Sequence, residues 1–262
     1  MIVEYHRPQS LEDALILLAR PEPPTLPMGG GASLNKPSSK EIAVVDLQDL
    51  GLDDYRKRGN FLDLGATLTL EVLFQRLDVL PDLKEAIRHE ANRNLRQVAT
   101  IAGTLISARG RSPFTTACLA LEATLSVVPG VSNGNGKPLE PEILSLGDVL
   151  PLREERLRGR VVTLITLPLN ARLAFRYVAR SPADKPIVCA AAVAWPSGRV
   201  RVSLGGYGGA PVLAFDGPEQ EGAETAARNA YSQAGDKWAS AAYREDVAGV
   251  LTARCLKDLE LA

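Results

Sequence analysis

Three consecutive glycines give this chain a segment that can contact a ligand through its backbone. Residues 27–34 read PMGGGASL and lie before the apolar run IAVVDL. Glycine has no Cβ and adopts positive φ readily, so another group can approach its N–H closely. The segment therefore predicts either a tight turn or a loop whose N–H groups bind an anion, with the Ser33 hydroxyl as a further donor.

A second segment of small and hydroxyl-bearing residues, TIAGT at 100–104, follows another apolar stretch. Two such loops suit a diphosphate, because N–H groups and hydroxyls can meet its charged oxygens without a lysine. We expect both loops to supply unpaired N–H donors. The common alternatives fit less well: GGGASL lacks the third glycine of the fingerprint G-x-G-x-x-G, and the sequence contains no Walker-type G-K-[ST].

Metal-binding and nucleophilic side chains are scarce. Cys118, Cys189 and Cys255 lie far apart in apolar stretches, and only His6 and His89 supply imidazoles. These residues cannot form a conventional zinc or iron–sulfur site, and they offer no convincing base for a nucleophilic triad. We interpret the thiols as buried and free. Redox chemistry would therefore need an organic cofactor or a metal centre on another chain.

The composition is that of an ordinary globular protein. Of 262 residues, 45% are hydrophobic and 23% charged, which suffices for two or three packed cores. The 30 basic and 31 acidic residues nearly cancel, which argues against a nucleic-acid partner or an anionic membrane surface. No apolar run reaches the roughly 18 residues of a membrane span, and MIVEYHRPQS does not resemble a signal peptide. We expect a cytoplasmic location.

Local patterns divide the chain into three regions, 1–55, 56–169 and 170–262. The first combines a helical pattern in SLEDALILLARP, which Ser10 can cap, with the glycine loop and the strand-like EIAVVDL, as in a βαβ unit. The second contains, in order, a strand in NFLDLGATLTL, helices over EVLFQRL and LPDLKEAIRHEANRNL, a short apolar strand in QVATIAGTL, a compact helix and another strand. The Gly-rich VSNGNGKPLEP that follows is typical of a hairpin connection.

The third region has a different pattern. IVCAAAVAWPSGRVRVSLGGYGG gives two β-prone runs around the turn PSG, and the chain becomes Ala-rich and helical after Val212. Strands followed by helices predict an α+β domain in which a three-stranded sheet carries helices on one face.

Six segments carry a resemblance over nearly the whole chain. They are PMGGGASL at 27–34, GNFLDLGATLTLEVL at 59–73, NLRQVATIAGTL at 94–105, LALEATL at 119–125, FRYVARSPADKPIVCAAAV at 175–193 and AAYREDVAGVLTARCL at 241–256. In this order they resemble the flavoprotein (medium) subunit of the molybdenum hydroxylases, which include carbon monoxide dehydrogenase and xanthine dehydrogenase. The resemblance implies an α+β fold with two α/β FAD-binding subdomains of the vanillyl-alcohol-oxidase-like (PCMH) type, 1–55 and 56–169. A C-terminal domain of the carbon monoxide dehydrogenase flavoprotein type, 170–262, would follow.

The resemblance also implies a site for FAD. Its diphosphate would lie between the two loops, its flavin near Arg176 and Asp184, and its sugar-like hydroxyls near Ser112. Arg96, just before the second loop, would either contact the ligand or tie a helix end to a sheet. The loops would contribute Met28, Gly29, Gly30, Gly31, Ala32, Ser33 and Leu34 from the first, and Thr100, Ala102, Gly103 and Thr104 from the second.

The sequence departs from the family at this site. Relatives have two glycines and an asparagine where this chain has Ala102, Gly103 and Thr104, and an acidic residue where it has Pro113. Losing one charged or well-aligned hydrogen bond costs about 1–3 kcal/mol, roughly 5- to 150-fold in affinity. FAD is therefore expected to bind weakly or to be lost on purification, unless Arg109 and Arg111 compensate.

The implied function is electron transfer without a catalytic acid, base or metal on this chain. A molybdopterin-binding large subunit would oxidise the substrate, a small subunit with [2Fe–2S] clusters would carry the electrons, and FAD here would deliver them to an acceptor. The active unit would be a hetero-oligomer. The alternative is a cofactor-poor structural or assembly subunit that retains the fold.

Overall fold

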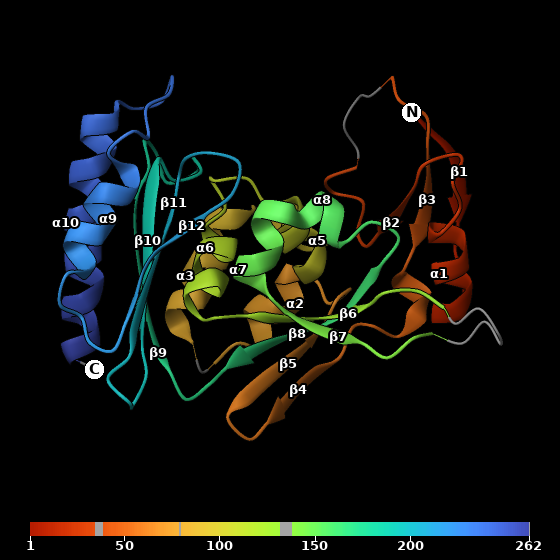
Figure 1. Ribbon diagram of the computed structural model, residues 1–262, viewed down its shortest axis with the longest axis horizontal. Coiled ribbons are helices and arrows are strands. Elements are labelled where there is room, and N and C mark those ends of the chain that lie inside the picture. Colours follow the sequence, from red (N-terminus) through yellow and green to blue (C-terminus); the bar gives the residue numbers. More distant parts are fainter. Residues whose placement is uncertain (35–38, 79, 132–137, 262) are drawn as a thin grey trace.

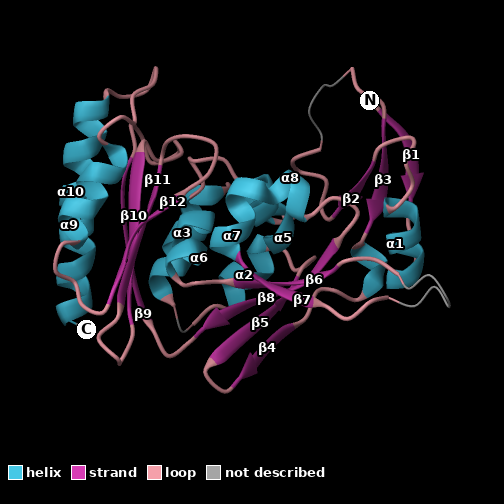
Figure 2. Cartoon of the chain, in the orientation of Figure 1, coloured by secondary structure: helices cyan, strands magenta, loops and turns pink. Residues whose placement is uncertain are grey.

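The computed structural model describes residues 1–34, 39–78, 80–131 and 138–261. Within these residues the chain is α+β, as predicted, and its strands form three separate sheets (Figure 2). Figure 1 shows the sheets in chain order, with central helices between the second and the third. The second sheet begins at Tyr55 and ends at Pro168. We therefore retain 1–55, 56–169 and 170–262 as proposed domains.

The first sheet is parallel and has the order β1-β3-β2. Ser10 accepts a hydrogen bond from the Asp13 N–H at 3.1 Å and caps α1, which confirms the predicted N-cap. The chain leaves β2 at Met28 and enters the glycine triplet directly. The elements are β1 (Ile2–His6), α1 (Leu11–Leu18), β2 (Thr25–Met28), β3 (Ile42–Asp46) and the 3-10 helix η1 (Gln48–Leu50).

The second sheet is antiparallel throughout and has the order β4-β5-β8-β6-β7. Strands β6 and β7 pair with each other, and Val131 bridges to Pro138, so the predicted hairpin pairing is confirmed. Its connection at 132–137 lies outside the described residues. The strands are β4 (Tyr55–Arg58), β5 (Phe61–Gly65), β6 (Thr124–Val128), β7 (Glu142–Ser145) and β8 (Val161–Pro168).

The helices of the second region differ from the prediction in two places. The long helix expected through LPDLKEAIRHEANRNL is broken at Ala91, whose backbone is extended, and Asn92 caps a new turn. The short strand expected at QVATIAGTL is a helix, because Thr100 caps it through the Gly103 N–H and Ile101, Ala102 and Leu105 bury one face. So short an apolar run fits either structure from sequence alone. The elements are α2 (Leu70–Arg76), α3 (Pro81–Glu90), α4 (Arg93–Arg96), α5 (Ile101–Ser107), α6 (Pro113–Ala120), α7 (Leu146–Val149), η2 (Leu150–Leu152) and α8 (Arg153–Arg156).

The third sheet has four antiparallel strands, in the order β12-β11-β10-β9, so the prediction of three strands is wrong. The segment after Val212, predicted as helical, is the β-prone run VLAFDG, which pairs with β11 through a shift of register between Val202 and Ser203. None of the described helices is long and apolar enough to cross a membrane. The elements are β9 (Arg172–Val178), β10 (Val188–Ala194), β11 (Val200–Gly205), β12 (Val212–Gly217), α9 (Ala223–Tyr231) and α10 (Ala241–Leu261).

Strand β10 joins two hydrophobic cores. Alternate side chains point to opposite faces of a strand. Cys189, Ala191 and Val193 pack into the core over the five-stranded sheet, whereas Val188 and Ala190 pack against α9 and α10. The small alanines let helices lie close on both faces, which explains the Ala-rich strand.

The three cysteines are buried free thiols, as predicted. Burial raises the pKa of Cys189 and of Cys255 to about 12, so neither forms a thiolate at neutral pH.

An ion-pair network joins the second region to the third sheet. Glu122, in the turn before β6, lies 2.8 Å from Arg199 and 3.0 Å from Arg201, and both arginines also contact Asp216. Hydrogen bonds from Arg199 hold the pKa of Asp216 below its ordinary value. The Arg201 side chain is only 7% exposed, so it depends on these carboxylates. Glu122 also has φ of +57°.

We predict that Glu122→Asn lowers the free energy of unfolding by about 1–2 kcal/mol, because buried Arg201 loses one of its two carboxylates. Asparagine tolerates positive φ, so the change removes the charge and keeps the backbone. Urea unfolding followed by circular dichroism measures the effect, with the exposed loop variant Glu140→Asn as control. Equal stability of the two variants would show that the network does not join the regions.

Candidate functional site

A cavity of about 570 Å³ lies where the three regions meet. Its walls are the loop after β2, parts of the segment 99–112, and C-terminal loops that carry Lys185, residues 206–208 and Trp238. Helix α5 lies between β2 and the third sheet (Figure 1), and it forms the floor between the two outer walls. A cavity of this size, shared by several regions, is typical of a cofactor site.

The glycine triplet allows two segments of backbone to touch. A Cβ on Gly30 would overlap the carbonyl oxygen of Val98, and a Cβ on Gly29 would lie 2.5 Å from the hydroxyl oxygen of Thr100. Gly31 has φ of +70°, in the left-handed region that favours glycine. Two glycines are thus required by the close approach of the loops and the third by a turn.

The first loop has N–H groups available for a ligand. The Leu34 N–H donates to the Gly31 carbonyl at 3.2 Å, whereas the N–H groups of residues 29–33 have no acceptor within the part of the chain that the structure describes. All of these residues line the cavity. Consecutive free N–H groups in a turn form a concave donor surface for an anion.

The second loop differs from the expectation that it too supplies unpaired N–H groups. It opens α5, and its first four N–H groups are paired: Ile101 with Leu68, Ala102 with Ala66, and Gly103 and Thr104 with Thr100. The hydroxyl of Thr104 donates to the Thr100 carbonyl at 2.8 Å, and that of Ser107 to the Gly103 carbonyl at 2.7 Å. Because these bonds use the hydroxyl protons, the hydroxyl oxygens can act toward a ligand only as acceptors, so this wall suits ligand hydroxyls better than phosphate.

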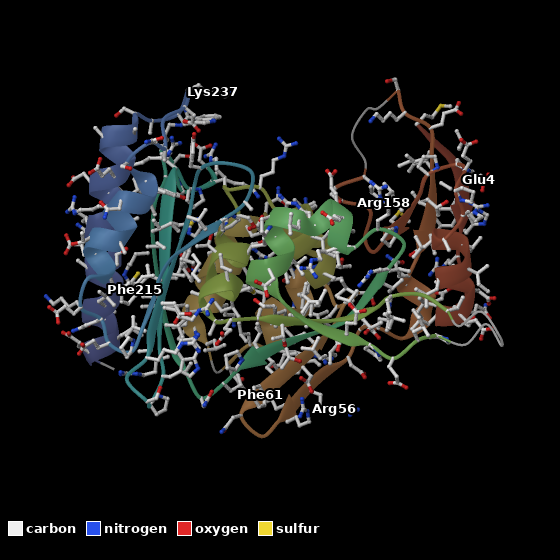
Figure 3. All side chains as sticks on the ribbon, viewed as in Figure 1. Glu4, Arg56, Phe61, Arg158, Phe215 and Lys237 are labelled. Carbon is white, nitrogen blue, oxygen red and sulfur yellow. The ribbon has the colours of Figure 1, made fainter. Side chains whose placement is uncertain are left out.

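Cations gather around an aromatic ring at the rim of the cavity. The guanidinium carbons of Arg111 and Arg180 lie 4.5 and 4.4 Å from the Trp238 ring centroid, and the Lys237 Nζ lies 5.3 Å from it. Figure 3 labels Lys237 on the loop between α9 and α10. Burial lowers the pKa of Arg111, which still carries its charge at neutral pH. The rim therefore adds positive charge to the cavity that the glycine loop also lines.

Two further arginines fix the C-terminal wall through carbonyl oxygens. Arg153 donates to the carbonyls of Ile106, at the end of α5, and of Gly209, at 3.2 and 2.7 Å. Arg244 is fully buried and donates to the Ala234 carbonyl at 2.6 Å. These bonds position the loops that carry the cavity residues 206–208, Asp236 and Trp238.

A buried carboxylate also lines the cavity. Glu90, at the end of α3, is 7% exposed. Its Oε1 lies 2.7 Å from the Lys185 Nζ, and its Oε2 accepts hydrogen bonds from the Ser112 hydroxyl at 2.6 Å and the Phe114 N–H at 3.2 Å. Glu90 was not among the site residues predicted from the sequence. The signal was present, since Glu90 falls on the apolar stripe of α3 with Leu83, Ala86 and Ile87.

The structure brings most of the predicted site residues together. Of the predicted site residues, those that line the cavity are Met28, Gly29, Gly30, Gly31, Ala32, Ser33, Leu34, Thr100, Gly103, Thr104 and Ser112. Whether they contact a cofactor stays a prediction.

Ala102, Arg176 and Asp184 are not among the described residues that line the cavity. Arg176 instead lies 2.6 Å from Asp258, and Asp184 lies 3.5 Å from Arg180.

Arg96 makes structural contacts, but they join helices to one another and not a helix end to a sheet. Its Nε lies 2.8 Å from the Glu71 carboxylate, and its Nη1 donates to the Ala91 carbonyl at 3.2 Å. The side chain therefore ties α4 to α2 and to the end of α3.

Solved structures share this fold. Reconstituted CO dehydrogenase from Oligotropha carboxidovorans superposes with a TM-score of 0.80 at 24% identity, over 97% of this chain and 96% of that one. Quinoline 2-oxidoreductase from Pseudomonas putida 86 gives a TM-score of 0.75 at 22% identity, over 97% and 95%.

Sequence comparison extends the likeness. The chain is 31% identical to the uncharacterized protein YgfM of Escherichia coli strain K12, over 100% of this chain and 98% of YgfM. It is 32% identical to the carbon monoxide dehydrogenase medium chain of Afipia carboxidovorans over 108 residues, 38% of each chain. Residues 1–140 match the family described as the FAD binding domain in molybdopterin dehydrogenase. The chain therefore belongs to the FAD-binding family of the molybdopterin dehydrogenases.

Proposed function

We propose that this chain is the electron-transfer subunit of a molybdenum-containing hydroxylase or dehydrogenase and that it binds FAD in the cavity between the three regions. The observation that carries the proposal is the cavity itself. It joins the free N–H groups of the first loop, the hydroxyls of α5 and the positively charged rim in one space of about 570 Å³.

The chemistry of the lining fits a flavin dinucleotide. Residues 29–33 offer N–H donors for the diphosphate, and Arg109 and Arg111 add positive charge from the adjoining wall. The hydroxyl oxygens of Thr104 and Ser107 can accept from sugar hydroxyls. When bound, FAD would supply the capacity to accept electrons and pass them on.

The residues of the chain would bind and orient the cofactor rather than transfer protons. Gly29 and Gly30 hold the two loops in contact, and Arg153 and Arg244 hold the opposite wall. The predicted contacts of Arg176 and Asp184 with the flavin would require these side chains to leave their ion pairs.

The competing function is a structural or assembly subunit that keeps the fold without the cofactor. One observation favours it: the N–H groups that open α5 are already paired, so the second loop offers phosphate fewer donors than the sequence suggested. Binding of added FAD by the purified chain, measured by titration, separates the two functions.

A flavin that exchanges electrons with an iron–sulfur cluster needs a partner, because the described residues of this chain offer no cluster ligands. Among the described residues, no group of His, Cys, Asp and Glu could hold a metal ion. We propose the molybdopterin-binding large subunit and the [2Fe–2S] small subunit as partners in a hetero-oligomer. The cytoplasmic location stays a prediction.

We predict that Thr104→Phe lowers FAD affinity at least about tenfold, because an aromatic ring would fill the space between the loops. The Thr104 hydroxyl bonds only within its own helix, so folding should change little. This variant is preferable to Gly30→Val, whose side chain would disturb the contact with Val98 even without a ligand. Thr225→Phe, on an exposed face of α9, is the matched control.

Calorimetric titration with FAD and the flavin absorbance left after gel filtration measure both variants. If Thr104→Phe binds FAD as tightly as the parent does, the cofactor does not occupy this cavity.

We also predict that the native protein purifies with an iron-containing companion. The iron content of the isolated complex and the bleaching of flavin absorbance on adding substrate test this. Full turnover from substrate to acceptor in a preparation free of iron would refute the partner assignment.

A further inference from the structure

Position 113 has lost a carboxylate that the resembling family carries, yet the structure supplies another one beside it. Ser112 and Phe114, the neighbours of Pro113, both donate to Oε2 of Glu90. The carboxylate reaches this place from α3, although 23 residues separate it from Pro113 in the sequence.

The bonding of Glu90 leaves it able to contact a ligand. A carboxylate offers about four acceptor positions. Three donors use it in the structure, namely the Lys185 ammonium, the Ser112 hydroxyl and the Phe114 N–H. These donors hold the carboxylate in place, and Glu90, at 7% exposed, lines the cavity. A charged acceptor of this kind binds hydroxyl donors more strongly than a neutral one.

We propose that Glu90 accepts hydrogen bonds from the sugar-type hydroxyls of the bound dinucleotide and so replaces the acidic residue missing at position 113. The inference rests on the proposed function, because it names a contact within the same site. If Glu90 supplies the acceptor that Pro113 lacks, the proline no longer gives a reason to expect weak FAD binding. The hydroxyls belong either to the ribityl chain of the flavin or to the ribose of the adenosine half.

The variant Glu90→Gln keeps the shape of the side chain and its acceptor oxygen but removes the charge. FAD affinity measured by calorimetry should fall about 10- to 100-fold. Glu85→Gln, which changes a carboxylate of α3 that pairs with Arg88, is the matched control and should bind as the parent does. Thermal unfolding of both variants checks that the fold persists.

Two fragments identify the hydroxyls. Titration with FMN tests the ribityl chain without the adenosine half, and titration with ADP tests the ribose without the flavin. The fragment whose affinity falls in Glu90→Gln carries the contact.

A second substitution tests the replacement itself. In the parent, Pro113→Asp would put a second carboxylate beside Glu90, where like charges repel, so FAD affinity should not rise. In the Glu90→Gln background the same change should raise affinity at least about fivefold, because it restores the missing acceptor. An equal gain in both backgrounds would overturn the inference.

The outcomes separate the inference from the function on which it rests. Failure of the parent to bind FAD would overturn both. Binding by the parent together with equal affinity in Glu90→Gln would overturn the role of Glu90 alone.

Discussion

The site depends on contacts between backbone segments that leave no room for a side chain. Gly30 lies against the Val98 carbonyl, and a Cβ on Gly110 would overlap the carbonyl oxygen of Tyr207. The Gly110 segment also exchanges main-chain hydrogen bonds with residues 206–208, at 2.6 and 3.0 Å. One contact joins the first region to the second and the other joins the second to the third. Gly30 from the first contact and residues 206–208 from the second line the cavity.

Hydrogen bonds and ion pairs of side chains then hold in place the loops that these glycine contacts bring together. Arg153 and Arg244 hold the C-terminal loops by their carbonyl oxygens, and Lys185 reaches across to Glu90. Outside the cavity, the ion pairs of Glu122 with Arg199 and Arg201 also join the second region to the third. Because the cavity-lining residues are already held in place, they lose little conformational freedom when a ligand binds, and this favours affinity.

Sequence reasoning found the features that local rules determine. The Ser10 cap, the glycine loop and the hairpin around PSG follow from residue type and short-range spacing. The strand after Val212 was missed because pairing with β11, and not the local sequence, determines that this segment is extended. Glu90 and Trp238 were missed for a related reason: only tertiary packing brings α3 and the loop after α9 to the cavity. Arg176 was placed at the flavin by resemblance; in the structure it pairs with Asp258 and does not line the cavity.

The most direct test of the central claim is a crystal structure of the chain saturated with FAD. The account predicts the diphosphate within hydrogen-bond distance of the N–H groups of residues 29–33, and a sugar hydroxyl within hydrogen-bond distance of the Glu90 carboxylate. A dinucleotide bound outside this cavity, or one whose diphosphate makes no contact with the glycine loop, would contradict it.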